Sequence, residues 1–301
     1  MAGLIDYAGL FPPASLNLAD ALDEYSRHLS CADNWMLGRF IIPAAQLANL
    51  PTLPDSWHFS VLGRSGATVP EFDRALDLDI SCLTAFRKIQ RAGTDVFEVR
   101  LPAPAFSSAN DLSALLNSTN RKLADENNLI VFHEIALDDA WRRNLETTIS
   151  AISQHNGQSG HRIGFKLRCG GVVAAAFPTV EQIAQALILC RDYSVPLKVT
   201  AGLHHPIRHY NESVRTKMHG FINVFGAGIL SQAHHLSLEQ TVEILNEEDP
   251  LNFGFTESHF AWKNLSADSA QIESIRNSGV TSYGCCSFDD PRNDMKKLGW
   301  M

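Results

Sequence analysis

The chain has 301 residues, of which 45% are hydrophobic and 19% are charged. These fractions exclude a disordered protein and allow one large α/β domain with a substantial core. The net charge of −8, without any basic patch, argues against nucleic acid and anionic membranes as partners.

The chain carries no signal that would place it in or across a membrane. Its first residues, Met1 to Asp6, lack the basic and apolar regions of a signal peptide. No uncharged apolar run reaches the roughly 18 residues of a membrane helix. We therefore expect a cytoplasmic protein, in which six cysteines without Cys-x-x-Cys spacing are reduced thiols.

Strand-like and helix-like runs alternate along the chain. Strands are expected near residues 4, 38, 58, 96, 130, 164, 196 and 281. Helical periodicity covers 17–29, 70–92, 109–126, 138–154 and 179–193, and the segment 213–277 is mainly helical. A polar Asp-Asp-Pro-Arg sequence at 289–292 predicts a further helix start after the last strand.

Eight strands that are apolar along both faces indicate a parallel sheet covered by helices. We therefore predict a single (β/α)₈ TIM barrel over 1–301, with 213–277 as a helical insertion before the last strand. The alternative is an open doubly wound sheet, which the lack of a Gly-x-Gly-x-x-Gly turn after an early strand weakens. The insertion is expected to form a lid or a homo-oligomer contact.

Two consecutive strands each carry a lysine in an apolar run. Alternation places Lys166 and Arg168 on one face of the first strand, and Lys198 and Thr200 on one face of the next. A buried ammonium needs a partner or loses its proton, so each lysine is either a structural ion pair or part of a site. If the two amines lie close together, each lowers the pKa of the other, and one becomes a nucleophile able to form a Schiff base.

In a barrel the functional site lies at the carboxyl ends of the strands. The polar residues expected there are Asp6, Arg39, Glu98, Arg100, His133, Glu134, Lys166, Arg168, Lys198, Thr200, His204 and His205. Inward cations outnumber inward acids in this set, which favours a small anionic substrate, a carboxylate or a phosphate ester. Arg168, Gly170 and Gly171 either hold that anion or form only a turn between strand and helix.

Three of these motifs resemble the class I deoxyribose-phosphate aldolase family, over about a third of the chain. They are Gly93-Thr-Asp-Val-Phe-Glu98, Gly164-Phe-Lys166 and Lys198-Val-Thr-Ala-Gly202. The resemblance implies Lys166 as the Schiff-base nucleophile, Lys198 as the neighbour that lowers its pKa, and Glu98 as general acid and base. It implies no cofactor and no metal. Glu98 stands where that family has Asp, and His204-His205-Pro206 has no counterpart there.

A second resemblance spans the whole chain. The segments 6–13, 164–171, 198–206 and 283–291 are similar to an uncharacterised bacterial family of β/α-barrel proteins. This resemblance implies the barrel fold and brings no reaction with it.

Three hypotheses for the function follow from these residues. The first is an aldolase-like lyase acting through Lys166, Lys198 and Glu98 on a small anionic carbonyl compound. Its substrate contacts would come from Arg100, Glu134, Arg168, Gly170, Gly171, Thr200, His204 and His205. The second is a metal-dependent hydrolase or isomerase using Glu134, His204 and His205. The third is a non-catalytic barrel that binds a small anion.

Cys169 and Cys286 are expected to be inert buried thiols.

Overall fold

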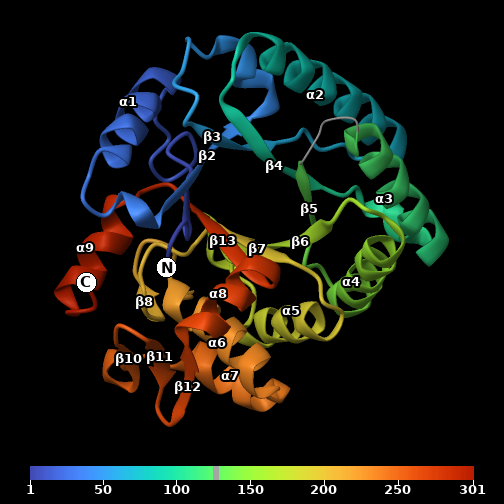
Figure 1. Cartoon of the computed structure of the whole chain (residues 1–301). Helices are drawn as coiled ribbons and strands as arrows, with labels where there is room; N and C mark the ends of the chain where they lie inside the picture. The colour runs from blue at the N-terminus through green and yellow to red at the C-terminus, as the bar shows by residue number, and fades with distance from the viewer. Residues whose placement is uncertain (125–128) are drawn as a thin grey trace. The chain divides into compact units, whose positions relative to one another are not determined.

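The computed structural model describes residues 1–124 and 129–301, and its main sheet is a closed barrel of parallel strands. The strand order is β1-β13-β7-β6-β5-β4-β3-β2 (Figure 1). The barrel strands are β1 (Ile5–Tyr7), β2 (Leu37–Pro43), β3 (His58–Leu62), β4 (Gly93–Arg100), β5 (Ile130–Glu134), β6 (Ile163–Arg168), β7 (Leu197–Thr200) and β13 (Val280–Cys285). The predicted (β/α)₈ barrel is therefore confirmed, and the open doubly wound sheet is excluded.

The predicted helices are present with nearby boundaries. They are α1 (Leu18–Leu29), α2 (Val69–Ile89), α3 (Ala109–Ala124), α4 (Trp141–Gln158), α5 (Val180–Asp192), α6 (Phe221–His234), α7 (Leu238–Asn246), α8 (Ser269–Ser278) and α9 (Asp289–Lys297). Asn17 caps α1, and Thr68 and Thr179 form capping boxes at the starts of α2 and α5. The end at residue 126 expected for α3 lies outside the described residues.

The chain divides into two compact units, and each is described by itself. Unit 1 comprises residues 1–37 and 167–301, and unit 2 comprises 38–166. In unit 2, β2 pairs with β3, β3 with β4, β4 with β5, and β5 with β6, all in parallel. In unit 1, β13 pairs in parallel with both β1 and β7. The single domain over 1–301 stays a prediction.

The insertion contains strands that its sequence pattern does not reveal. Besides α6, α7 and most of α8, the region holds β9 (Thr216–Met218), which forms an antiparallel hairpin with β8 (His209–Asn211), just before the region begins. It also holds an antiparallel sheet of β10 (Phe253–Phe255), β11 (His259–Trp262) and β12 (Leu265–Asp268). Strands of three or four residues are too short to show a clear two-residue period.

The core of unit 2 sets the direction in which its strand residues point. The ring of Phe59 lies 5.7 Å from that of Phe86 on α2, so Phe59 faces the helices. Side chains alternate along a strand, so Ser60 faces the opposite way, into the barrel interior. In unit 1 the ring of Tyr283 stacks on that of Phe221 of α6 at 5.4 Å, which turns Ser282 inward. The packing of apolar residues such as Phe59 and Tyr283 against the helices therefore turns their polar strand neighbours, Ser60 and Ser282, toward the barrel interior.

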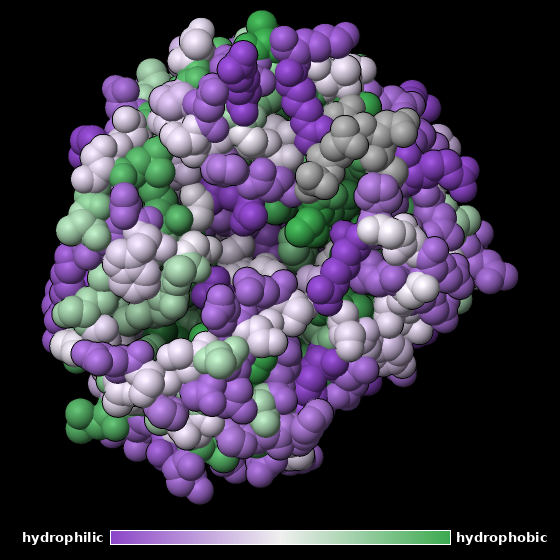
Figure 2. All heavy atoms as spheres, viewed as in Figure 1, coloured by the Kyte–Doolittle hydropathy of each residue, from purple (hydrophilic) through white to green (hydrophobic). Residues whose placement is uncertain are grey.

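The face of the molecule drawn in Figure 2 is largely polar. Hydrophilic side chains predominate on the face drawn in Figure 2, and apolar residues form separate smaller areas. No helix in the described ranges combines the length and the apolar character needed to cross a membrane.

Candidate functional site

Lys166 lies at the centre of a buried ion-pair cluster in unit 2. Its Nζ is 2.8 Å from Glu98 Oε2 and 2.9 Å from Glu134 Oε2. Ser60 Oγ donates a hydrogen bond of 2.5 Å to the other carboxylate oxygen of Glu98. All four side chains are buried. The cluster therefore combines one amine, two carboxylates and a hydroxyl that orients one of them.

Strand register explains why these residues meet. Glu134 of β5 is the register partner of Lys166 of β6, and Glu98 projects from β4 on the other side of β5. His133 precedes Glu134 and therefore points outward, where burial beside His155 lowers its pKa to about 3. His133 was expected among the inward residues and is instead part of the layer between strand and helix.

The charge state of Lys166 differs from the sequence-based expectation. Burial alone would lower the pKa of this amine, but the charges of Glu98 and Glu134 and their hydrogen bonds outweigh burial and raise it. The predicted lowering of the pKa of Lys166 is therefore wrong. The resting amine is an ammonium ion, and a carboxylate must accept its proton before it can act as a nucleophile.

Lys198 belongs to a second buried cluster, in unit 1. Its Nζ donates to Asp6 Oδ2 and, at 3.3 Å, to Ser282 Oγ, while Ser282 Oγ donates to Asp6 at 2.7 Å. Lys198 and Asp6 are 0% exposed. Lys198 is therefore paired with one buried carboxylate, and Lys166 with two. The expected excess of inward cations is not found at either lysine.

Arg100 lines a pocket of about 460 Å³ in unit 2, at the carboxyl ends of its strands. It lies two residues after Glu98 on the same face of β4 and is the register partner of Glu134. Leu101, Ala136 and Asn144 also line this pocket. Arg39 was expected at the same end, but its Nε lies 3.4 Å from Asp95, near the amino ends of β3 and β4.

The residues after β6 and β7 form a tightly packed pair of turns in unit 1. A Cβ on Gly170 would lie 2.8 Å from the Cα of Gly202, and a Cβ on Gly171 would lie 2.8 Å from that of Ala176. The backbone N–H of Cys169 donates to the carbonyl oxygen of Thr200 at 2.8 Å. These contacts give both glycines a packing role, and anion binding by Arg168 stays a prediction.

A cysteine and histidine cluster lies at the carboxyl ends of β7 and β13. His204 Nδ1 is 3.6 Å from Cys286 Sγ and 3.7 Å from Cys285 Sγ. A hydrogen bond from Cys285, reinforced by His204 and the backbone of Ala14, lowers the pKa of Cys286 to about 5. The lowered pKa favours the thiolate of Cys286, in contrast to the inert thiol that the sequence predicts.

The other predicted thiol and histidine behave differently. Burial raises the pKa of Cys169 well above its usual value, so this thiol is inert as expected. His205 Nδ1 lies 2.6 Å from Asp294 Oδ2. The two adjacent histidines thus engage different partners, one a thiolate and the other a carboxylate.

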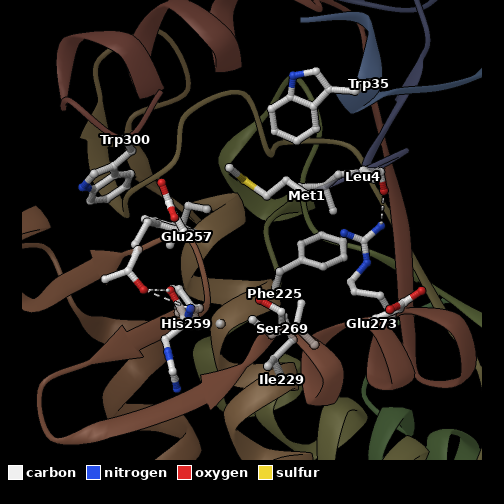
Figure 3. Close-up of a pocket in the computed structure, with 18 of the residues that line it drawn as sticks. Met1, Leu4, Trp35, Phe225, Ile229, Glu257, His259, Ser269, Glu273 and Trp300 are labelled. Carbon is white, nitrogen blue, oxygen red and sulfur yellow. Dashed lines mark hydrogen bonds between the residues drawn. The ribbon is translucent and has the colours of Figure 1, made fainter.

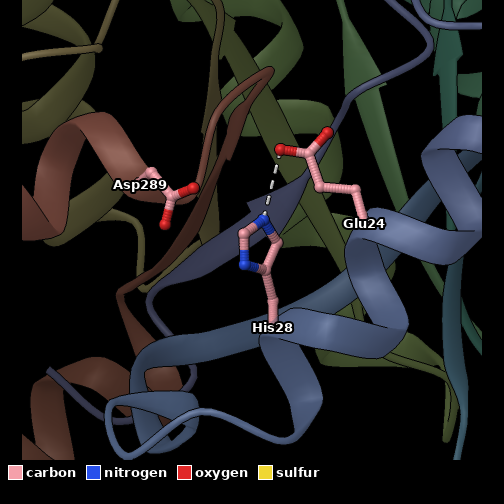
Figure 4. A group of neighbouring side chains, drawn as sticks. All are labelled: Glu24, His28 and Asp289. Atoms are coloured by element: carbon pink, nitrogen blue, oxygen red, sulfur yellow. Dashed lines mark ion pairs between the residues drawn. The ribbon is translucent and has the colours of Figure 1, made fainter.

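One group in the described part of the chain has the composition of a metal site. Glu24, His28 and Asp289 offer ligand atoms within 4.8 Å of one another, and His28 Nε2 lies 3.5 Å from Glu24 Oε1 (Figure 4). Burial lowers the pKa of His28, so its imidazole is neutral, as a metal ligand must be. Arg292, however, already pairs with Asp289, and a cation would have to displace its guanidinium. The sequence does not reveal this group, because its members come from α1 and α9.

Comparison with known proteins does not assign this chain to a family. The chain matches no model of a protein family and no curated protein. The structure shows a closed β/α barrel, and neither comparison supports the resemblance to the aldolases.

Proposed function

We propose that this barrel is a lyase that acts on a small anionic carbonyl compound through an imine on Lys166. The observation that carries the proposal is the placement of one buried ammonium between two carboxylates at 2.8 and 2.9 Å. When one carboxylate takes a proton from Lys166, the cluster contains a neutral amine, a carboxylic acid and a carboxylate. These are a nucleophile, a general acid and a general base within one contact distance.

The reaction balances with the groups of this cluster alone. Glu98, oriented by Ser60, accepts a proton from Lys166, and the amine adds to the carbonyl carbon. The carbonyl oxygen takes up two protons and leaves as water, which converts the ammonium and the carbonyl compound into a protonated imine. The bond between the α- and β-carbons then breaks, its electron pair moves into the imine to form an enamine, and Glu134 accepts the hydroxyl proton of the departing aldehyde. Transfer of this proton to the enamine carbon and addition of water to the resulting imine release the second product and restore Lys166.

Arg100 supports an anionic substrate. It is exposed, follows Glu98 on the same face of β4, and lines the pocket at the carboxyl end of that strand. A guanidinium group binds carboxylate and phosphate in a bidentate fashion. Lys198 is assigned a positioning role, because its ammonium is bound by Asp6 and Ser282.

Hydrogen exchange tests the proposal without knowledge of the natural substrate. An imine acidifies the neighbouring C–H bonds, so the wild-type protein should speed exchange of protons in pyruvate, dihydroxyacetone phosphate or acetaldehyde with D₂O, measured by NMR. Lys166→Met should abolish this exchange, whereas Lys122→Met, at a partly exposed surface lysine, should retain it. Equal exchange by Lys166→Met, or no exchange of any of the three compounds, contradicts the proposal.

A second function is favoured by the Cys286 thiolate and its contact with His204. In this case the thiolate adds to a carbonyl carbon, and His204 donates a proton to the resulting alkoxide. Cys286→Ser would then abolish turnover while Lys166→Met would not. Loss of turnover in Lys166→Met, with turnover retained in Cys286→Ser, supports the imine on Lys166.

A further inference from the structure

A large pocket in unit 1 lies apart from the groups discussed above. Its volume is about 600 Å³, within the range of about 300–1,000 Å³ typical of small-molecule sites. It is lined by residues that precede β1 and β13, at the amino ends of these strands. Cys286 and His204, in contrast, follow the carboxyl ends of β13 and β7. The pocket is therefore not part of a site at the carboxyl ends.

Aromatic side chains provide much of the lining. Trp35 and Trp300 lie on different sides of the pocket in the view of Figure 3, and Phe225 lies below Trp35, with the Met1 side chain between these two rings. Phe260 and Ile229 add further apolar surface. Trp35 is 47% exposed, which is unusual for so large an apolar side chain and leaves its ring free to cover a ligand.

One cation in this pocket keeps unused hydrogen-bonding capacity. Arg276 Nη2 donates to the carbonyl oxygen of Ala2 at 3.3 Å, and the guanidinium carbon lies 5.4 Å from the centre of the Phe225 ring. Its Nε is buried and has no hydrogen-bond partner within residues 1–124 and 129–301. Burial lowers the pKa of Arg276 to about 10, but the group is still charged at neutral pH.

The carboxylates around the pocket do not neutralise Arg276. Glu257 and Glu273 also line it, but both are exposed, and neither forms an ion pair with Arg276 among the described residues. A partly buried guanidinium with a free N–H in apolar surroundings is best matched by a carboxylate that brings its own apolar body.

We propose that this pocket binds an aromatic monocarboxylate, with the carboxylate on Arg276 and the ring against the apolar lining that includes Trp35 and Phe225. The unused N–H of Arg276 and the nearby α-ammonium of Met1 together favour a negatively charged group. The aromatic walls select a flat apolar body, because aromatic rings pack favourably against one another. The ligand is thus a small molecule bound away from the carboxyl ends of the strands.

Calorimetric titration of the full chain with 3-phenylpropionate tests this proposal, with 3-phenylpropionamide as the neutral probe of the same shape. The acid should bind saturably at one site per chain, and the amide at least tenfold more weakly. Arg276→Met should weaken binding of the acid at least tenfold, while Arg121→Met, the same change on an exposed helix position, should leave it unchanged.

The comparison of acid and amide uses only the wild-type protein, so the test holds even if Arg276→Met fails to fold. Quenching of tryptophan fluorescence by the acid should be reduced in Trp35→Phe. Equal binding of acid and amide, no saturable binding of either, or unchanged affinity in folded Arg276→Met overturns the proposal.

Discussion

Replacing Lys166 by Met removes the ammonium that pairs with two buried carboxylates, Glu98 and Glu134. Methionine keeps the length and apolar stem of the side chain, so the change is mainly one of charge. Removal of one partner from a buried ion pair typically costs about 3–5 kcal/mol, because the remaining charge is left uncompensated. With an m-value of about 2–3 kcal/mol/M, the midpoint of urea unfolding should fall by about 1–2 M.

The loss of stability in Lys166→Met should increase as the pH rises. Without Lys166, burial raises the pKa values of the two carboxyl groups above the ordinary value of about 4.3 that they keep in the unfolded chain. The stability of the variant is then highest below about pH 4.3 and falls as the pH rises through the raised values, so the deficit is larger at pH 8 than at pH 5.5. In the wild type the pKa of Lys166 is raised, so its contribution persists up to about pH 10 and is lost only above it.

Urea unfolding followed by tryptophan fluorescence at pH 5.5 and pH 8 measures both effects. Lys122→Met is the matched control, because Lys122 lies in the same unit and also contacts two carboxylates, at 3.1 and 2.7 Å, but at the surface. It should cost no more than about 1 kcal/mol. The reasoning is refuted if Lys166→Met costs less than about 1 kcal/mol at pH 8, or if its deficit is the same at both pH values.

Three further predictions concern other parts of the chain. Asp6→Asn leaves the Lys198 ammonium buried without its carboxylate and should destabilise the protein by about 3–5 kcal/mol in thermal unfolding, and a loss below about 1 kcal/mol would refute the pairing. Alkylation of Cys286 by iodoacetamide, followed by peptide mass spectrometry, should be almost independent of pH between 6 and 8, because the pKa is lowered to about 5; a tenfold rise per pH unit would show an ordinary thiol. Thr68→Ala removes the cap of α2 and should cost about 1 kcal/mol in urea unfolding, whereas an unchanged midpoint would show that the capping box contributes nothing.

The fold could be predicted because its signals are local. Each barrel strand is a short apolar run, and helix starts are marked by capping residues such as Asn17, Thr68 and Thr179. The faces of β4 and β6 follow from alternation, so Glu98 and Lys166 could be assigned to the interior. Strands β10 to β12 could not be predicted, because three or four residues do not establish a period.

The charge state of the site could not be predicted, because it depends on contacts between distant segments. Asp6 and Lys198 are 192 positions apart, and nothing in either motif identifies the other as its partner. The same holds for His204 and Cys286, 82 positions apart, whose contact adds to the hydrogen bond from Cys285 in lowering the pKa of Cys286. The pocket at Arg276 draws on six separate stretches of unit 1, and no sequence motif marks it.

Borohydride trapping detects an imine on Lys166 directly, because reduction converts the imine into a stable secondary amine. The full chain is incubated with pyruvate or dihydroxyacetone phosphate, reduced, digested and mapped by mass spectrometry, with Lys166→Met and Lys122→Met treated in parallel. One reduced adduct should be found on Lys166 in the wild type and in Lys122→Met, and none at position 166 in Lys166→Met. A protein that turns over a carbonyl compound with Lys166 unmodified, or an equal adduct spread over surface lysines, would contradict it.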